Sequence, residues 1–369
     1  MSISFSLIES IIVMFLMILA GYVLVRVKIL QAKDSDVLSK LVLYVACPAS
    51  IIYSFQIQLT SENMIGFLIS LTAGFSMHFL FILMAWLLGK KLHLTPIEKA
   101  SMIYPNAGNL IIPLVIMVLG RDMVIYCSGA LIANTILLWT HGRELVTGDR
   151  TGDWKKILGN INIIAIAIGM LLFLCSIQLP DVINTTINSL SAILAPLSMF
   201  VVGMILSTAD LREVFMNKRA YMVCFFRLLV FPIITMFLFI ITGLTRITPN
   251  ASSILMITML AASAPSASTV AQFASLYHKE AQLASVINVM SLGPFHDLTE
   301  FRPVVDLFKF HHLNRCSGDD AAVKIAVLDV IKSLIEFADM CSRCIDRLMC
   351  LCTDEIQFNL QRRISQQSG

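Results

Sequence analysis

The sequence predicts an all-α integral membrane protein with about ten transmembrane helices, and three observations carry this prediction. The 369 residues are 57% hydrophobic and 14% charged, with a mean hydropathy of +0.82, whereas a soluble domain carries about 25% charged residues. Apolar runs of a length that crosses a bilayer recur along the chain, and basic residues gather in alternate connections. Lipid is therefore the expected solvent for most of the chain.

Nine apolar runs are long enough to cross a membrane, and the connections between them are too short for an inserted soluble domain. A tenth run begins at Leu283 and stops at Gly293-Pro294, after about half a bilayer at about 1.5 Å per residue. The first run contains Glu9 and has no basic residue before it, so we expect a retained span and not a cleaved signal peptide. The nine runs cover about residues 7–25, 38–55, 65–88, 100–119, 124–139, 161–177, 187–207, 220–242 and 252–276.

Lysine and arginine are distributed unevenly between the two sets of connections. One set holds fifteen of them, and the other set holds only Arg121 and Arg246. Because basic loops stay in the cytoplasm, we expect a multi-pass protein of the cell (plasma) membrane with its N-terminus outside and residues 140–160 in the cytoplasm.

A faint internal repeat relates the two halves of the apolar part. A shift of 157 positions places Ala107-Gly108-Asn109 on Ala264-Pro265-Ser266, and residues 46–50 resemble residues 194–198. Five spans is an odd number, so the second copy must enter the membrane inverted, as in many secondary transporters. We therefore expect a transmembrane bundle over residues 1–293, with one repeat at about 1–140 and the other at about 160–293.

The fourth and ninth runs are poor membrane helices at corresponding positions of the two repeats. Proline removes a backbone hydrogen bond that hydrocarbon cannot replace, so such segments lie inside protein or line a cavity. Paired breaks of this kind indicate a transport site, where freed amides and half-helix N-termini can hold an anion. Close packing of small residues is the alternative explanation. The expected substrate-binding residues are Asn106, Gly108, Asn109, Pro265, Ser266 and Ser268, and the helix-breaking residues are Pro105, Pro113 and Pro265.

Two basic side chains lie inside predicted spans, and each has two interpretations. Arg227 either extends to the cytoplasmic face or acts as counter-charge to a carboxylate. His78 is either a hydrogen-bonded structural residue or a proton carrier. Glu9 is the only acidic residue expected near a span interior, so a cation site built on buried carboxylates is not expected.

Four segments together resemble the auxin efflux carrier family. They are residues 21–30 at the end of the first span, residues 40–49 in the second, residues 106–114 in the fourth and residues 264–268 in the ninth. The resemblance covers about residues 1–292. It implies two inverted five-helix repeats whose broken fourth and ninth helices cross, with substrate bound at the crossing.

The resemblance also implies a function, and other functions remain open beside it. It implies a secondary transporter, an efflux carrier or permease, that moves a small organic anion such as malate or malonate by an elevator-like, alternating-access mechanism. Proton or sodium coupling and a homodimer are compatible with it, and no cofactor, metal or nucleic acid is implied. The alternatives are a sodium-coupled symporter of the bile-acid type and a membrane sensor with the tail as its output module. An enzyme is not expected, because no catalytic cluster is found.

The segment 294–369 differs in composition from the rest of the chain. It holds 20 of the 51 Asp, Glu, Lys and Arg residues, and residues 319–364 have the pattern of an amphipathic helix. Five cysteines lie here, but their spacing does not suit four tetrahedral zinc ligands. We expect an atypical, polar, helical tail that contributes nothing to transport.

Overall fold

The computed structural model describes residues 3–56, 61–107, 111, 115, 119, 121–148, 159–209, 217–242, 244 and 250–292. The chain divides into two units, Met1–His296 and Asp297–Gly369, and every described residue belongs to the first. The predicted tail and its cysteines therefore lie outside the described residues, as do Gly108, Asn109 and Pro113.

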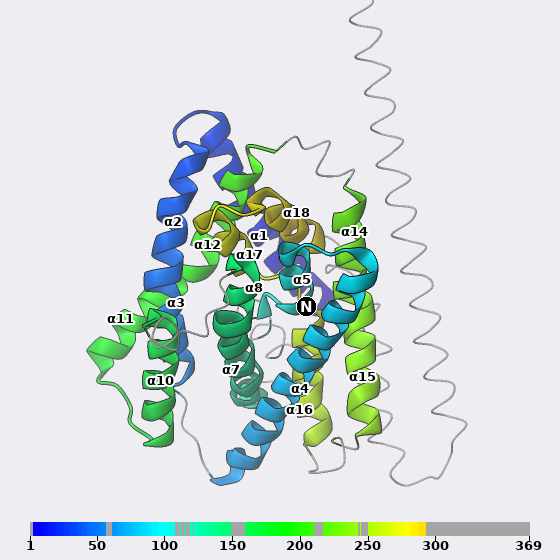
Figure 1. The fold of residues 1–369 in the computed structure, drawn as a ribbon. Coiled ribbons are helices and arrows are strands. Elements are labelled where there is room, and N and C mark those ends of the chain that lie inside the picture. Colours follow the sequence, from blue (N-terminus) through cyan, green and yellow to red (C-terminus); the bar gives the residue numbers. More distant parts are fainter. Residues whose placement is uncertain are drawn as a thin grey trace, which may run out of the picture. The chain divides into compact units, whose positions relative to one another are not determined.

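The first half of the described chain is helical and contains two π-helical stretches, Val42–Ala46 and Leu138–Gly142, which join consecutive α-helices into longer segments (Figure 1). Short 3₁₀ helices at Ala32–Asp34 and Arg121–Tyr126 precede two of these segments. The α-helices are α1 (Ile3–Arg26), α2 (Ser35–Leu41), α3 (Cys47–Ser54), α4 (Ser61–Leu92), α5 (Pro96–Ile103), α7 (Cys127–Leu137) and α8 (Arg143–Thr147).

The second half has the same character, with a third π-helical stretch at Phe226–Val230. Its α-helices are α10 (Ile161–Leu174), α11 (Asp181–Ala192), α12 (Leu194–Leu206), α14 (Lys218–Phe225), α15 (Phe231–Ile241), α16 (Ala251–Ser263), α17 (Ser268–Leu276) and α18 (Ala281–Leu292).

Length and composition agree with the membrane fold that the sequence predicts. Among the described residues, five helical segments are long and apolar enough to cross a membrane: Ala32–Ser54, Met64–Leu92, Met123–Thr147, Asp181–Leu206 and Lys218–Ile241. Shorter apolar helices cover Ile12–Arg26, Ile161–Leu174, Ala251–Ser263 and Ala281–Leu292. These segments follow the order of the predicted spans, and the fourth span is represented by α5.

The helix contacts of the two halves mirror one another, as expected for an inverted repeat. The helix α1 of the first half packs on α12 of the second half, and α10 of the second half packs on α3 of the first. Likewise α4 packs on α7 and α16, while α14 packs on α18 and α5. Two sets of helices result. We call α1, α2, α3, α10, α11 and α12 the scaffold group, and α4, α5, α7, α8 and α14 to α18 the crossing group.

Two glycines allow α1 and α12 to pack backbone to backbone. A side chain at Gly203 would overlap the carbonyl of Ile18, and one at Gly21 would overlap the carbonyl of Phe200. Small residues bring helices together in this way in membranes, where van der Waals contact replaces the hydrophobic effect between helices. Gly21 and Gly203 therefore account for the close approach of α1 and α12.

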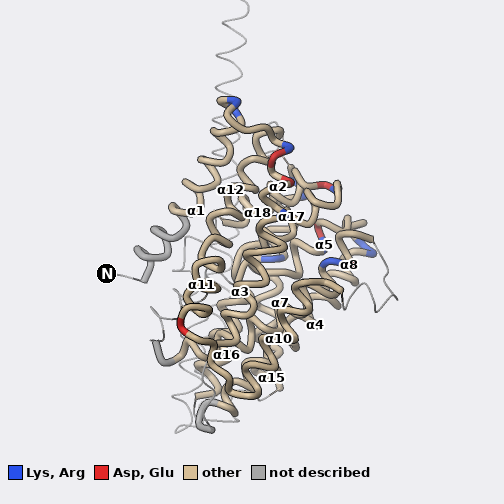
Figure 2. Tube along the Cα trace, turned by 90° about the vertical axis from the view of Figure 1, so that its left-hand side faces the viewer, with Lys and Arg blue, Asp and Glu red and all other residues tan. Residues whose placement is uncertain are grey.

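Charged residues gather at one end of the bundle (Figure 2). This end holds the end of α1, the start of α2 and the connections around α5 and α8, whereas most of the remaining tube carries no charge. Two hydrogen bonds join the scaffold and crossing groups there. Ser275 Oγ donates to Asp36 Oδ1 at 2.7 Å, and Gln282 Nε2 donates to Thr208 Oγ1 at 2.8 Å. We call this the basic end.

Candidate functional site: the crossing of two broken helices

The fourth and ninth segments cross at their breaks and pair there as a short antiparallel bridge between Pro105 and Ser266. The amide of Asn106 donates to the carbonyl of Pro265 at 2.7 Å, and the amide of Ala267 donates to the carbonyl of Tyr104 at 3.0 Å. Two amides and two carbonyls released by the breaks are thus paired with one another across the crossing. This is the condition for irregular backbone inside a membrane.

Proline causes both breaks. A residue that precedes proline is driven out of the helical region into extended conformation. Tyr104, before Pro105, has φ −99° and ψ 116°, and Ala264, before Pro265, has φ −62° and ψ 151°. The helix α5 therefore ends at Ile103 and α16 at Ser263, and α17 begins at Ser268 once the chain has passed the bridge.

The bridge corrects the alignment of the two repeats. Residues that face each other across a local two-fold axis are equivalent, so Pro105 corresponds to Ser266. Their separation is 161 positions, four more than the gapless shift of 157. The difference is about one helical turn. The gapless comparison was therefore wrong in register, although it matched the correct two segments.

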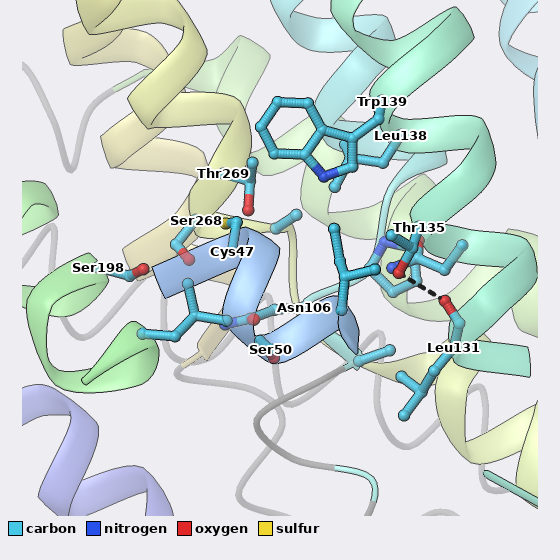
Figure 3. Close-up of a pocket in the computed structure, with 16 residues that line it drawn as sticks. Cys47, Ser50, Asn106, Leu131, Thr135, Leu138, Trp139, Ser198, Ser268 and Thr269 are labelled. Carbon is cyan, nitrogen blue, oxygen red and sulfur yellow. Dashed lines mark hydrogen bonds between the residues drawn. The ribbon is translucent and has the colours of Figure 1, made fainter. Parts of the chain in front are cut away.

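A cavity of about 110 Å³ lies beside the crossing, between the scaffold and crossing groups (Figure 3). The close-up shows side chains from α3, α7, α12 and α17 arranged around a common space. The described lining residues are Cys47, Ser50, Ile51, Pro105, Asn106, Ala107, Leu131, Asn134, Thr135, Leu138, Trp139, Leu194, Ser198, Ala267, Ser268 and Thr269.

The lining is polar but carries no formal charge. It combines hydroxyl groups and two amides with the apolar faces of several side chains, and the described lining holds no Lys, Arg, His, Asp or Glu. The first two residues of α17, Ser268 and Thr269, belong to it, so the positive end of that helix faces the cavity. A ligand in this cavity would contact hydrogen-bond donors and the end of a helix dipole, and no charged side chain of the described lining.

The structure separates the residues predicted to bind substrate into three sets. Asn106 and Ser268 line the cavity. Pro265 and Ser266 form the crossing itself, where the Ser266 amide donates to Ser291 Oγ at 3.0 Å and the Ser266 carbonyl accepts a hydrogen bond from Asn288 Nδ2 at 2.6 Å. The remaining two, Gly108 and Asn109, lie outside the described residues.

Sequence reasoning missed the scaffold side of the cavity. Ser50 and Ser198 face it from α3 and α12, and they occupy matching places in the two similar segments 46–50 and 194–198. That repeated Pro-x-Ser pattern was the available signal. Asn134, Thr135 and Trp139 were also missed, because they lie on an apolar helix without a break.

His78 is a buried, hydrogen-bonded residue of α4. Its Nδ1 lies 2.8 Å from the carbonyl of Gly74, and its Nε2 lies 3.0 Å from Oδ1 of the cavity-lining Asn134. These contacts are those of a hydrogen-bonded structural residue that orients Asn134 in the cavity lining. A structural histidine was one of the two interpretations of the sequence.

Arg227 is fully buried and does not extend to the membrane surface, so the interpretation as a side chain that reaches water is wrong. Its Nη1 donates to the carbonyl of Met102 at 3.2 Å and its Nη2 to the carbonyl of Ala264 at 3.0 Å. The guanidinium therefore contacts both broken helices near the crossing.

A buried carboxylate also corrects the expectation from the sequence. Glu98, in the first turn of α5, is fully buried and forms an ion pair with Arg219 of α14 at 2.6 Å. Its second oxygen accepts from Arg219 Nη2 and from the amide of Thr95, which completes a capping box. Glu98 lies just before the predicted fourth span, which begins at about residue 100, and this is why it was not counted.

Comparison with known proteins agrees with this geometry. No curated protein matches the chain. A family model with the description "Membrane transport protein" matches in two segments, residues 6–153 and 150–292, which together cover most of the chain and all of the crossing. The chain therefore belongs to this family of membrane transport proteins, the auxin efflux carrier family, as the sequence resemblance indicated.

Proposed function

We propose that the chain is a secondary transporter of a small organic anion, in particular a short carboxylate, and that the cavity beside the crossing is its binding site. One observation carries the proposal: an uncharged, donor-rich cavity lies at the meeting point of the two broken helices, with the positive end of α17 facing it. Hydroxyl and amide donors suit carboxylate oxygens, and the helix end favours negative charge.

The volume of the cavity favours a short acid. A cavity of about 150 Å³ accommodates benzene, so about 110 Å³ suits acids of the size of malonate or malate better than an indole-sized anion. The proposed substrate is therefore a short acid and is not taken from the name of the family.

The position of the cavity between the two groups of helices supports an elevator-like movement. Ser50 and Ser198 come from the scaffold group, whereas Asn106, Asn134 and Ser268 come from the crossing group. If the crossing group slides along the scaffold group, the ligand moves with the amides and leaves the two serines. We assign the basic end to the cytoplasm and the N-terminus to the outside of the cell membrane.

Reconstituted protein tests the proposal. Purified full-length chain in proteoliposomes should take up radiolabelled malonate or malate saturably, and the neutral diamide of malonic acid should not compete. Ser50→Ala and Ser198→Ala should weaken uptake, whereas Ser54→Ala should not, because Ser54 is absent from the described cavity lining and its hydroxyl donates to the carbonyl of Ile51. Equal competition by the diamide would contradict anion selectivity, and absence of uptake across a panel of mono- and dicarboxylates would contradict the substrate class.

A further inference from the structure

Arg227 is a fully buried cationic residue of the crossing group. It lies in the π-helical stretch Phe226–Val230 between α14 and α15, and its side chain is fully buried. Among the described ion pairs it has no carboxylate partner. The guanidinium carbon lies 5.4 Å from the ring centroid of Phe81, a favourable cation–π distance.

The two carbonyls that Arg227 contacts are among those that the breaks leave without helical partners. Within a continuous helix the carbonyl of Met102 would accept from the amide of Asn106, but that amide donates to Pro265. The carbonyl of Ala264 follows the end of α16. Helix C-termini always leave such carbonyls, and here one guanidinium satisfies one from each broken helix.

The charges match as well as the hydrogen bonds. A helix C-terminus is equivalent to about −0.5 elementary charge, so the ends of α5 and α16 together present about −1. The guanidinium supplies one positive charge at their meeting point. The positive end of α17, which faces the cavity, is then left uncompensated for an anionic ligand.

In transporters with broken helices, half-helix C-terminal ends and unwound carbonyls are the groups that coordinate a coupling Na⁺. We propose that the guanidinium of Arg227 occupies the position of such an ion, as a cation fixed to the chain, and that the protein therefore neither binds nor requires sodium. Arg227 is absent from the described cavity lining, so it is a positioning residue that holds the two broken helices together. The binding part of this inference stands apart from the proposed function, and the transport part rests on it.

Thermal unfolding of the full-length protein in detergent tests the binding part without a substrate. A ligand that binds the folded state raises the Tm, so exchange of KCl for NaCl should leave the wild-type Tm unchanged. Arg227→Ala should lower the Tm by about 10 °C, because two carbonyls and two helix ends lose their cation. Guanidinium chloride at about 10 mM should recover part of this loss by entering the vacated space, and Arg227→Lys should lose less than Arg227→Ala.

Arg143→Ala is the matched control, because Arg143 is only partly buried and donates to Tyr277 Oη instead of to helix-end carbonyls. Guanidinium should not stabilise it. A sodium-dependent rise in the wild-type Tm would overturn the inference, as would an unchanged Tm in Arg227→Ala. Equal recovery of both variants by guanidinium would also overturn it.

Uptake into proteoliposomes tests the transport part. Malonate uptake by the wild type should proceed at the same rate with NaCl, KCl or choline chloride outside. An uptake rate that falls at least tenfold without sodium overturns the inference and leaves the proposed function standing. If no carboxylate is taken up in any salt, the proposed function fails, and the unfolding measurements still decide whether Arg227 replaces a bound cation.

Discussion

Nε2 of His78 lies 3.0 Å from Oδ1 of Asn134, and this contact links the interior of the crossing group to the wall of the cavity. His78 is not one of the described residues that line the cavity. Its second ring nitrogen is held by the carbonyl of Gly74 on the same helix, so the ring has a fixed orientation. The amide of Asn134 is therefore presented to the cavity in a fixed orientation too.

We predict that His78→Leu disturbs binding without touching the ligand. Loss of the His78 ring leaves the buried amide oxygen of Asn134 without this partner, which lowers the free energy of unfolding by about 1–3 kcal/mol. The variant should therefore unfold at a lower temperature and bind malonate about tenfold more weakly. His78→Gln should retain part of both properties. Phe79→Leu changes the next residue, whose side chain is exposed on the other side of α4, and should behave as wild type. Differential scanning fluorimetry with a malonate titration measures both effects, and identical malonate affinity in His78→Leu would contradict this role.

The serines of α3 and α12 should contribute similarly to affinity, because they occupy matching positions in the two repeats. Each of Ser50→Ala and Ser198→Ala should raise the Kd for the carboxylate about two- to tenfold, as expected for one neutral donor worth about 0.5–1.5 kcal/mol. Isothermal titration of the two single variants and of the double variant measures this. A loss confined to one of the two serines would show that the ligand is bound by one repeat only.

The two hydrogen bonds at the basic end should keep that end closed. Asp36→Ala removes the partner of Ser275, and a hydrogen bond to a charged group contributes about 1.5–3 kcal/mol. In a variant that retains Cys47 as its single cysteine, we expect thiol reagents applied from the basic end to label Cys47, a cavity residue, about tenfold faster after Asp36→Ala.

A matched variant at the second contact sharpens the labelling experiment. Gln282→Ala removes the bond to Thr208, which carries no charge, and should accelerate labelling less than Asp36→Ala. Labelling from the opposite side should not increase in either variant. If Asp36→Ala leaves the labelling rate from the basic end unchanged, the contact does not close the path.

Backbone contact between α1 and α12 predicts a strong steric effect. Gly203→Ala would place a methyl group in the carbonyl of Ile18, and overpacking of this kind costs about 1–3 kcal/mol. We expect a Tm several degrees lower, with the malonate affinity of the remaining folded protein unchanged. Leu19→Ala, on the exposed side of α1, should have little effect. A Gly203→Ala variant as stable as wild type would show that the two helices can separate without cost.

The sequence was sufficient for the membrane fold and for the location of the crossing, because both follow from local rules. Hydropathy and length determine spans, and Pro105 and Pro265 break helices wherever they stand. The alignment of the two repeats at the crossing was harder to predict from the sequence. The gapless shift places Asn109 on Ser266, whereas the backbone bridge pairs Pro105 with Ser266, and no local sequence rule fixes which residues form that bridge.

The tertiary partners of the buried charged residues could not be predicted from the sequence. Arg227 looked like a side chain near a membrane surface because depth was counted along one helix, whereas its burial depends on α5 and α16 packing around it. Glu98 was overlooked for the same reason, since its partner Arg219 is far away in sequence. Only tertiary contact decides whether a charge at the end of a span meets water or protein.

The reciprocal hydrogen bonds of Asn106 to Pro265 and of Ala267 to Tyr104 have a kinetic consequence. The local two-fold axis that exchanges the two repeats converts one bond of this pair into the other. The crossing is therefore equivalent when viewed from either side of the membrane. The crossing therefore imposes no direction on transport, and we expect the transport cycle to run in both directions. Net flux should then reverse when the concentration gradient of the anion is reversed, and preloaded vesicles should exchange internal for external anion faster than they empty.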